Sequence, residues 1–175
     1  MDKPLNVIIV GAGHRAFVYA GYALKYPDKM KIVGVADPNP ARRALTAQKF
    51  GFENNADHCF STAEELAKHP RFADAVINGT MDHQHVPTAL PLLKTGYGML
   101  LEKPFATYEE EMWQLADTAE KNNSKVMICH VLRYAPFYTA IKQKILEGTI
   151  GDILNIQMNE HVSYHHMAVG FVRGK

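Results

Sequence analysis

The sequence predicts an α/β fold, a doubly wound parallel sheet of the Rossmann type, followed by the beginning of a second α/β domain. Two observations carry this prediction. Short segments that are apolar on both faces alternate with helix-like segments along most of the chain, which is typical of parallel strands covered by helices on both sides. A glycine-rich turn follows the first apolar run and opens the first helix, as expected where a ligand binds beyond the ends of the strands.

Strands are expected where apolar and β-branched residues cluster without proline. The five segments are "LNVIIVG" from residue 5, "KIVGVAD" from residue 31, "ADAVINGT" from residue 73, "YGMLLEK" from residue 97 and "KVMICHVL" from residue 125. Each is too short for a buried helix and is bounded by turn residues, which favours the strand interpretation.

Helices are expected between these strands because start and stop signals flank each interval. The intervals are residues 14–26, 39–51, 61–70, 83–95, 107–123 and 135–148. Pro40 stands in a first turn and Gly51 follows a last turn, as is usual for helix ends. Ser61 and Thr62 are able to cap the third helix.

The organisation changes near residue 150. Residues 1–150 are predicted to form the first domain, and "GDILNIQMNEHVSYHH" from residue 151 alternates like a half-polar strand that opens a second domain over residues 151–175. Too few residues follow to close that sheet, so the chain is expected to be an N-terminal portion of a longer protein. Pairing of this strand with the first sheet or with another copy is the alternative.

The composition gives no global attraction to nucleic acid or membrane, because 19 Lys and Arg residues nearly balance 18 Asp and Glu residues. No segment approaches the roughly 18 apolar residues of a membrane span, and the start lacks a signal-peptide cleavage site. Cys59 and Cys129 fit no metal or redox spacing. A cytoplasmic protein with reduced thiols is the expectation.

The segment "VIIVGAGHRA" predicts a dinucleotide site. Gly11 permits a tight turn, Gly13 lets a pyrophosphate approach the backbone and Ala16 lets helix and strand pack closely. The helix N-terminus then offers free N–H groups to the phosphates. Such a glycine turn also occurs without a ligand, but here it follows a strand and opens a helix.

Asp37 ends the second strand at about the spacing expected for the acid that binds the adenosine ribose. Its charge would oppose a 2′-phosphate, so NAD is favoured as the cofactor. Arg42 and Arg43 leave NADP open, because an arginine at this place is able to receive that phosphate or lie against the adenine. Both arginines are equally able to be solvated helix charges.

Together, "VGAGHR", "GVADPNPARR", "NGTMDHQHVPTAL" and "LLEKPFAT" resemble the Gfo/Idh/MocA family, named for glucose-fructose oxidoreductase and inositol dehydrogenase. The resemblance covers essentially the whole chain, and "EKP" is its most specific motif. It implies an N-terminal Rossmann domain that binds NAD(P), a C-terminal α/β domain that supplies much of the substrate pocket, and a homo-oligomer.

The resemblance makes Lys103 the catalytic residue, which contacts substrate and nicotinamide and assists proton transfer. Glu102 would face the nicotinamide ribose, and Pro104 would fix the turn through a cis peptide. This agrees with the chemistry, because oxidation of a secondary alcohol releases a hydroxyl proton that a lysine is able to share. A surface ion pair in a turn is the alternative for Lys103.

The resemblance also implies further cofactor-binding residues. They are His14 and Arg15 in the first turn, Thr80 and His85 in the loop near the nicotinamide ribose, and Arg133 after the fifth strand. Met81 departs from the proline usual in that loop. Arg133 and Tyr134 are equally able to be structural. A metal is not expected, because His83 and His85 lack a complete set of ligands. His161, Tyr164, His165 and His166 are weak candidates for a sugar or polyol pocket.

The expected function is hydride transfer between NAD(P) and a sugar, polyol or related cyclic alcohol. Two alternatives stay open, an NAD-dependent glycosidase-type enzyme and a dinucleotide-binding sensor without turnover. The resemblance places a second catalytic segment in the C-terminal domain, beyond Lys175. A chain that ends there is expected to bind dinucleotide with little or no activity.

Overall fold

The structure, a computed structural model, describes residues 3–168, which form two compact units divided after His130. The first unit holds one sheet in the order β3-β2-β1-β4-β5-β6 with every pair of neighbours parallel. The strands are β1 (Leu5–Val10), β2 (Met30–Ala36), β3 (Cys59–Phe60), β4 (Ala75–Asn78), β5 (Gly98–Leu101) and β6 (Val126–Ile128). This confirms the predicted doubly wound Rossmann fold.

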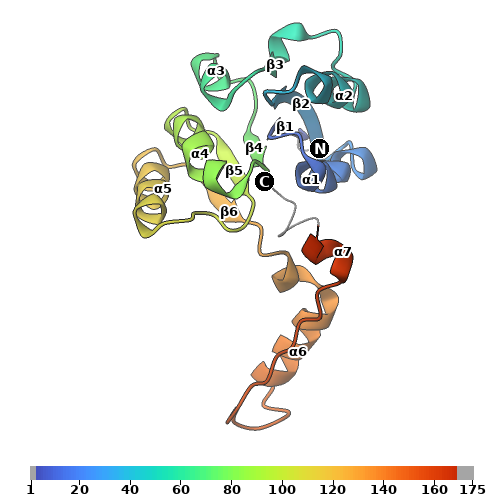
Figure 1. Cartoon of the computed structure of the whole chain (residues 1–175), viewed down its shortest axis with the longest axis vertical. Helices are drawn as coiled ribbons and strands as arrows, with labels where there is room; N and C mark the ends of the chain where they lie inside the picture. Colours follow the sequence, from blue (N-terminus) through green and yellow to red (C-terminus); the bar gives the residue numbers. More distant parts are fainter. Residues whose placement is uncertain (1–2, 169–175) are drawn as a thin grey trace. The chain divides into compact units, whose positions relative to one another are not determined.

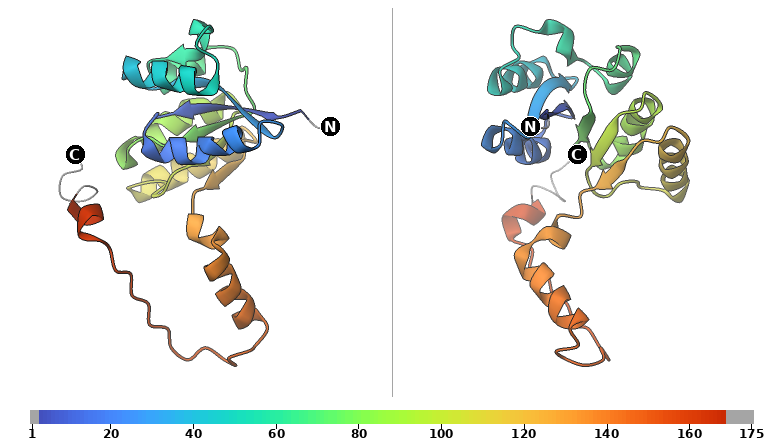
Figure 2. Two further views of the ribbon diagram at one scale, coloured as in Figure 1. Left: turned by 90° about the vertical axis from the view of Figure 1, so that its right-hand side faces the viewer. Right: turned by 180° about the vertical axis from the view of Figure 1, so that it is seen from behind.

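Helices cover both faces of this sheet (Figures 1 and 2). The helices α1 (His14–Lys25) and α2 (Pro40–Phe50) lie on one face. On the other face lie α3 (Ala63–Lys68), α4 (His85–Lys94) and α5 (Glu109–Lys121). Two short 3₁₀ helices, η1 (Ala56–His58) and η2 (Asp82–Gln84), occur in the connections.

The central strand β1 shows why the strands had to be apolar on both sides. Ile8 and Val10 pack in the core under α3, α4 and α5, whereas Val7 and Ile9 pack in the core under α1 and α2. Successive side chains of a strand point to opposite faces. A strand buried between two helical layers therefore presents apolar side chains to both of its faces.

The helix boundaries follow the predicted signals. Asn39 caps α2 with its side-chain oxygen, Pro40 is its first residue and Gly51 ends it in the left-handed conformation with φ 76°. Thr62 caps α3 by accepting a hydrogen bond from the Glu65 N–H at 3.1 Å. Caps of this kind satisfy backbone groups that the helix itself leaves unpaired.

The second unit contains η3 (Val131–Tyr134), α6 (Pro136–Leu146) and the one-turn α7 (Tyr164–Met167). The half-polar strand predicted from residue 151 is wrong for the described part, since residues 151–163 pair with no strand and residues 164–167 are helical. A strand exists only with a partner to accept its hydrogen bonds. Residues 169–175 lie outside the described residues, and the assignment of residues 151–175 to a second domain stays a prediction.

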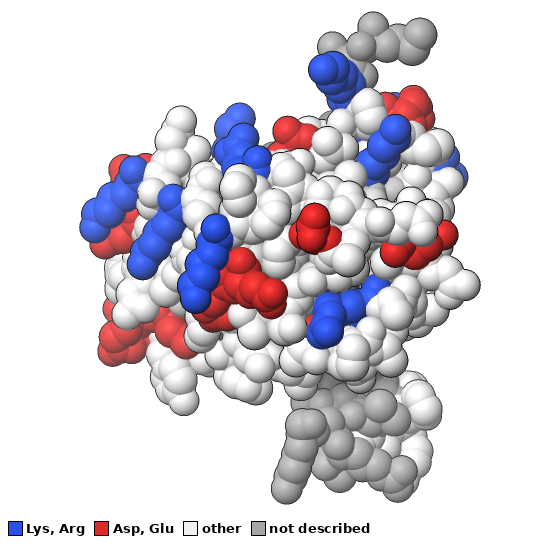
Figure 3. Space-filling model, turned by 90° about the horizontal axis from the view of Figure 1, so that it is seen from above, with Lys and Arg blue, Asp and Glu red and all other residues white. Residues whose placement is uncertain are grey.

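The surface is mixed in charge. In the view of Figure 3, lysine and arginine side chains stand beside acidic ones and neutral residues separate the groups. This agrees with the formal net charge of +1. Within residues 3–168, no helix is long and apolar enough to cross a membrane.

Candidate dinucleotide-binding site

A cleft of about 530 Å³ opens at the carboxyl ends of β1, β2 and β4. Gly11, Gly13, Asp37, Arg42 and Thr80, all predicted from the sequence, contribute to its lining. A larger hollow of about 690 Å³ lies between the last turns of α1 and α2, and none of the residues that line it was predicted to bind cofactor or to be catalytic. The smaller cleft is the candidate site, because ligands of open α/β sheets bind at the carboxyl ends of the strands.

The two glycines of the first turn have different roles. Gly11 has φ +76°, and a Cβ there would stand 2.8 Å from the Thr80 backbone, so the fold itself requires glycine. Gly13 has an ordinary φ of −85° and a Cβ there would meet nothing within 4 Å. The space beside Gly13 is open to a ligand.

Close packing of helix and strand, predicted at Ala16, is present. A Cβ added to Gly79 would stand 3.0 Å from the Ala16 Cβ, and Ala16 is fully buried. The small residues let the first turn of α1 approach the end of β4.

The helix that faces this space begins without a side-chain cap. Gly13 is the N-cap of α1 and the first turn holds no acid, whereas α2 and α3 are capped by Asn39 and Thr62. The first N–H groups of a helix carry a partial positive charge and need acceptors. At α1 a phosphate is a suitable acceptor.

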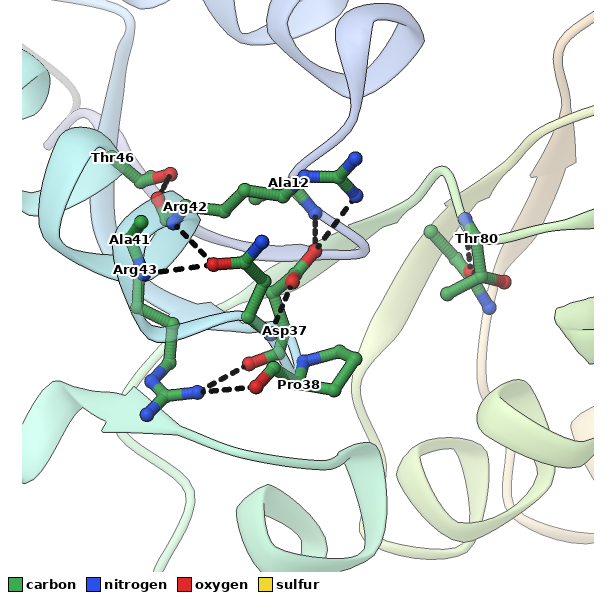
Figure 4. A network of polar contacts seen from close by, with 10 residues as sticks. Ala12, Asp37, Pro38, Ala41, Arg42, Arg43, Thr46 and Thr80 are labelled. Atoms are coloured by element: carbon green, nitrogen blue, oxygen red, sulfur yellow. Dashed lines mark hydrogen bonds and ion pairs between the residues drawn. The ribbon is translucent and has the colours of Figure 1, made fainter.

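Asp37 forms the floor of the cleft and is only 3% exposed. Its Oδ2 accepts a hydrogen bond from the Ala12 N–H at 2.8 Å, and its Oδ1 accepts one from the Asn39 N–H at 2.8 Å (Figure 4). The carboxylate thus ties the glycine turn to the end of β2. Each oxygen keeps a second lone pair, so ribose hydroxyls still have acceptors.

The two arginines of α2 are separated by the structure (Figure 4). Arg42 is exposed, with Nη1 3.8 Å from Oδ2 of Asp37, and lies at the cleft. Arg43 donates from Nη1 to the carbonyls of Asp37 and Pro38 at 2.7 and 3.2 Å. Arg43 therefore stabilises the loop, and Arg42 is the arginine with access to a ligand.

A buried amide supports the loop after β4. Asn78 is 1% exposed and accepts a hydrogen bond from the Thr80 hydroxyl at 2.8 Å. Its Nδ2 donates to the His85 carbonyl at 3.2 Å and to the Thr88 hydroxyl at 2.9 Å. These bonds hold Thr80 at the cleft, and its predicted contact with the cofactor stays a prediction.

His85 lies behind this loop and not on the cleft surface. It is 1% exposed, with Nε2 3.1 Å from the Thr80 carbonyl and Nδ1 2.6 Å from the Pro104 carbonyl. Its predicted contact with the cofactor stays a prediction, whereas its contacts with two loops are part of the structure.

Two predicted residues meet at the end of β5. The Glu102 carboxylate, 6% exposed, pairs with Nε of Arg15 at 2.9 Å and accepts a hydrogen bond from the Tyr19 hydroxyl at 2.7 Å. It also accepts one from the Lys103 N–H. Burial and the bond to Glu102 raise the pKa of the Tyr19 hydroxyl well above its ordinary value, and burial raises the pKa of the neighbouring Cys129 thiol.

Tyr19 and Asn78 were missed by the sequence reasoning. Tyr19 stands one helical turn after Arg15, and residues four apart share a helix face, so that spacing was a usable signal. Asn78 carried a weaker signal, as a polar residue inside the apolar run "AVIN".

Lys103 is exposed and joined to Pro104 by a cis peptide bond, as the resemblance implied. In the part of the chain that the structure describes, its ammonium group has no hydrogen bond or ion pair. His14 is exposed at the start of α1. Arg133 lies in η3 of the second unit, where its carbonyl accepts a bond from Thr139. Within residues 3–168, no group of three potential metal ligands comes together.

Curated dehydrogenases and oxidoreductases match most of this chain over part of their own length. Levoglucosan dehydrogenase from Pseudarthrobacter phenanthrenivorans is 30% identical over 160 residues, covering 87% of this chain and 40% of the relative. Mouse trans-1,2-dihydrobenzene-1,2-diol dehydrogenase is 32% identical over 123 residues, covering 70% and 35%. The chain thus spans about two fifths of the length of the curated relatives it matches.

Solved structures share the fold. The WlbA dehydrogenase from Bordetella pertussis, in complex with NADH and UDP-GlcNAcA, superposes with a TM-score of 0.76 at 21% identity, over 85% of this chain and 42% of its own. The scyllo-inositol dehydrogenase from Lactobacillus casei superposes with a TM-score of 0.77 at 23% identity, over 86% of this chain and 44% of its own.

The family model described as "Oxidoreductase family, NAD-binding Rossmann fold" matches residues 5–130. The chain therefore belongs to this family, the Gfo/Idh/MocA oxidoreductases.

Proposed function

We propose that this chain binds NAD(H) in the cleft and contributes Lys103 to an NAD(P)-dependent dehydrogenase that acts on a sugar, polyol or related cyclic alcohol. The observation that carries the proposal is the open space at Gly13, beside the uncapped start of α1 and in the same cleft as Asp37. No side chain of residues 3–168 fills this space, although the turn around it is tightly constrained.

In this proposal the first N–H groups of α1 bind the pyrophosphate, and Asp37 accepts hydrogen bonds from the adenosine ribose hydroxyls. The buried negative charge of Asp37 favours NAD over NADP. Arg42, exposed beside it, lies against the adenine or receives a 2′-phosphate if NADP binds.

Bound NAD⁺ would supply the hydride acceptor for oxidation of a secondary alcohol. Lys103 then acts on the reacting hydroxyl in one of two ways. As an amine it accepts the hydroxyl proton, and as an ammonium group it stabilises the developing alkoxide. Lys103 is exposed, and its side chain forms no hydrogen bond or ion pair within residues 3–168, so such a partner can reach its nitrogen.

The substrate class rests on the relatives. Their names specify levoglucosan, a dihydrobenzene diol and scyllo-inositol, each a ring compound that carries hydroxyl groups. Activity, substrate and assembly into a homo-oligomer are proposed for the whole protein that contains this sequence.

The test is a matched pair of substitutions on α1. At Gly13 and Gly21 an added Cβ meets nothing within 4 Å, so Gly13→Val and Gly21→Val should both fold with little change in Tm. We expect Gly13→Val to weaken NADH binding by at least ~30-fold, about 2 kcal/mol, in a fluorescence titration. Gly21→Val should bind like the parent. Equal binding by both variants would contradict the proposed site.

A further inference from the structure

We propose that His85 is a positioning residue that joins the dinucleotide-side loop at Thr80 to the turn that carries Lys103. The loop is residues 79–84 and the turn is residues 102–106. The hydrogen-bonded linkage is a property of the fold. Its importance for catalysis rests on the proposed function.

The linkage is made by the two ring nitrogens of one buried side chain. Nδ1 stands 2.6 Å from the Pro104 carbonyl and Nε2 stands 3.1 Å from the Thr80 carbonyl. Carbonyl oxygens only accept hydrogen bonds, so each ring nitrogen bonds to its carbonyl only while that nitrogen carries a proton. The two bonds form together in the doubly protonated ring, and a neutral ring donates to one of the two carbonyls at a time. Within residues 3–168, no other side chain forms a hydrogen bond with either carbonyl.

Each end of the linkage matters to the site. Thr80 lines the cleft, and its backbone lies 2.8 Å from where a Cβ on Gly11 would stand, so Thr80 and the glycine turn are in close contact. Pro104 follows Lys103 directly, and the residue before the lysine, Glu102, is already held by Arg15 and Tyr19. Glu102 thus holds the turn before Lys103, and His85 holds it after Lys103, at Pro104.

This arrangement fixes the backbone of Lys103 from both sides while leaving its side chain free. A displacement of about 1 Å in a catalytic group is enough to lower a rate by about 100-fold. The contact at Thr80 also means that a change in the dinucleotide loop is transmitted to the lysine turn through one side chain.

The test uses amides that replace one ring nitrogen each. The side-chain nitrogen of asparagine stands near the position of Nδ1 and that of glutamine near Nε2. His85→Asn should thus keep the bond to Pro104, His85→Gln should keep the bond to Thr80, and His85→Ala removes both. His83→Ala is the matched control, because His83 is exposed two residues earlier.

The measurement is amide hydrogen exchange of the chain without cofactor, followed by mass spectrometry of peptides. We expect His85→Asn to accelerate exchange about tenfold in the loop, His85→Gln to do so in the turn, and His85→Ala in both. The control should change neither. If His85→Ala does not fold, the opposite pattern of the two amide variants still decides the question.

Two outcomes would overturn the inference. One is unchanged exchange in loop and turn. The other is uniform acceleration that includes β1, for every variant at position 85, which would make His85 an ordinary core residue. Because the readout needs no cofactor, a parent protein that fails to bind NADH would reject the proposed function and leave this result interpretable.

Discussion

The two parts of the proposed site, one at the end of β2 and the other at the end of β5, are built in opposite ways. At the end of β2, Asp37 is buried and both its oxygens are bound by backbone N–H groups. At the end of β5, Lys103 has a firmly held backbone and an exposed side chain that forms no hydrogen bond or ion pair in the described part of the chain. A binding group gains from being fixed before the ligand arrives. The proposed role of Lys103 in proton transfer requires a fixed backbone and a nitrogen that is able to exchange a proton.

The largest effect is expected at the fixed end. Asp37→Ala removes the acceptors of the Ala12 and Asn39 N–H groups, so the free energy of unfolding should fall by roughly 1–3 kcal/mol. NADH binding should weaken by at least ~100-fold. Urea unfolding and NADH titration measure the two effects. Asp28 is an exposed acid after α1, and Asp28→Ala, the control, should change neither quantity. An Asp37→Ala protein with the parent's stability and NADH affinity would contradict the proposed role of Asp37.

At Lys103, the effect on turnover should be separate from the effects on stability and on NADH binding. Lys103→Ala should lower turnover by about 100-fold or more in the protein that carries this chain, while Tm and NADH affinity stay near the parent values. Steady-state rates and a binding titration give the comparison. Lys94→Ala, an exposed lysine of α4, is the control. Turnover retained in Lys103→Ala contradicts the catalytic role, and no turnover in the parent favours a sensor.

The arginines of α2 sharpen the comparison at the fixed end. Arg43→Ala should cost about 1 kcal/mol of stability because two loop carbonyls lose their donor. Arg42→Ala should leave stability unchanged and shift the ratio of NADPH to NADH affinity by a few-fold, within about 1 kcal/mol. Thermal unfolding and paired titrations distinguish them. The reverse assignment of effects would show that Arg43 is the ligand-facing residue.

The smallest effect concerns pH at the lysine end. The pKa of Tyr19 is raised above its ordinary 10.0 by burial and by Glu102, so the folded state keeps this proton longer than the unfolded state. The contribution to stability is present below pH 10 and is lost as pH rises above it. Tyr19→Phe should therefore show a weaker loss of stability between pH 9 and pH 11 (~10 being the unfolded pKa) in urea unfolding. An unchanged slope would contradict this.

The sheet and the dinucleotide turn could be predicted because their signals are local. The apolar run of β1 and the glycines around Gly11 are both visible in a few consecutive residues, although the contacts that require them come from distant parts of the chain. The strand β3 was missed because a strand of two residues is too short to show an alternating pattern. The strand predicted from residue 151 was wrong for the opposite reason. An alternating pattern indicates which face of a segment is apolar, but it does not show that a neighbouring strand is present to pair with it.

The parts of the site that could not be predicted are contacts across the chain. Tyr19 meets Glu102 at a separation of 83 residues, and His85 meets Pro104 at 19. The sequence predicted Arg15 and Glu102 as separate cofactor residues, and only the folded arrangement shows them paired. Such networks depend on which loops the sheet order brings together.

The double anchoring of Asp37 has a consequence for changing cofactor preference by design. A substitution that removes this acid to admit a 2′-phosphate also unties the glycine turn, because Ala12 loses its acceptor. A successful redesign must supply a replacement acceptor, for example a hydroxyl or amide oxygen that reaches the same N–H. At the proposed cofactor site, a substitution of Asp37 therefore has to preserve this backbone contact as well as change the charge.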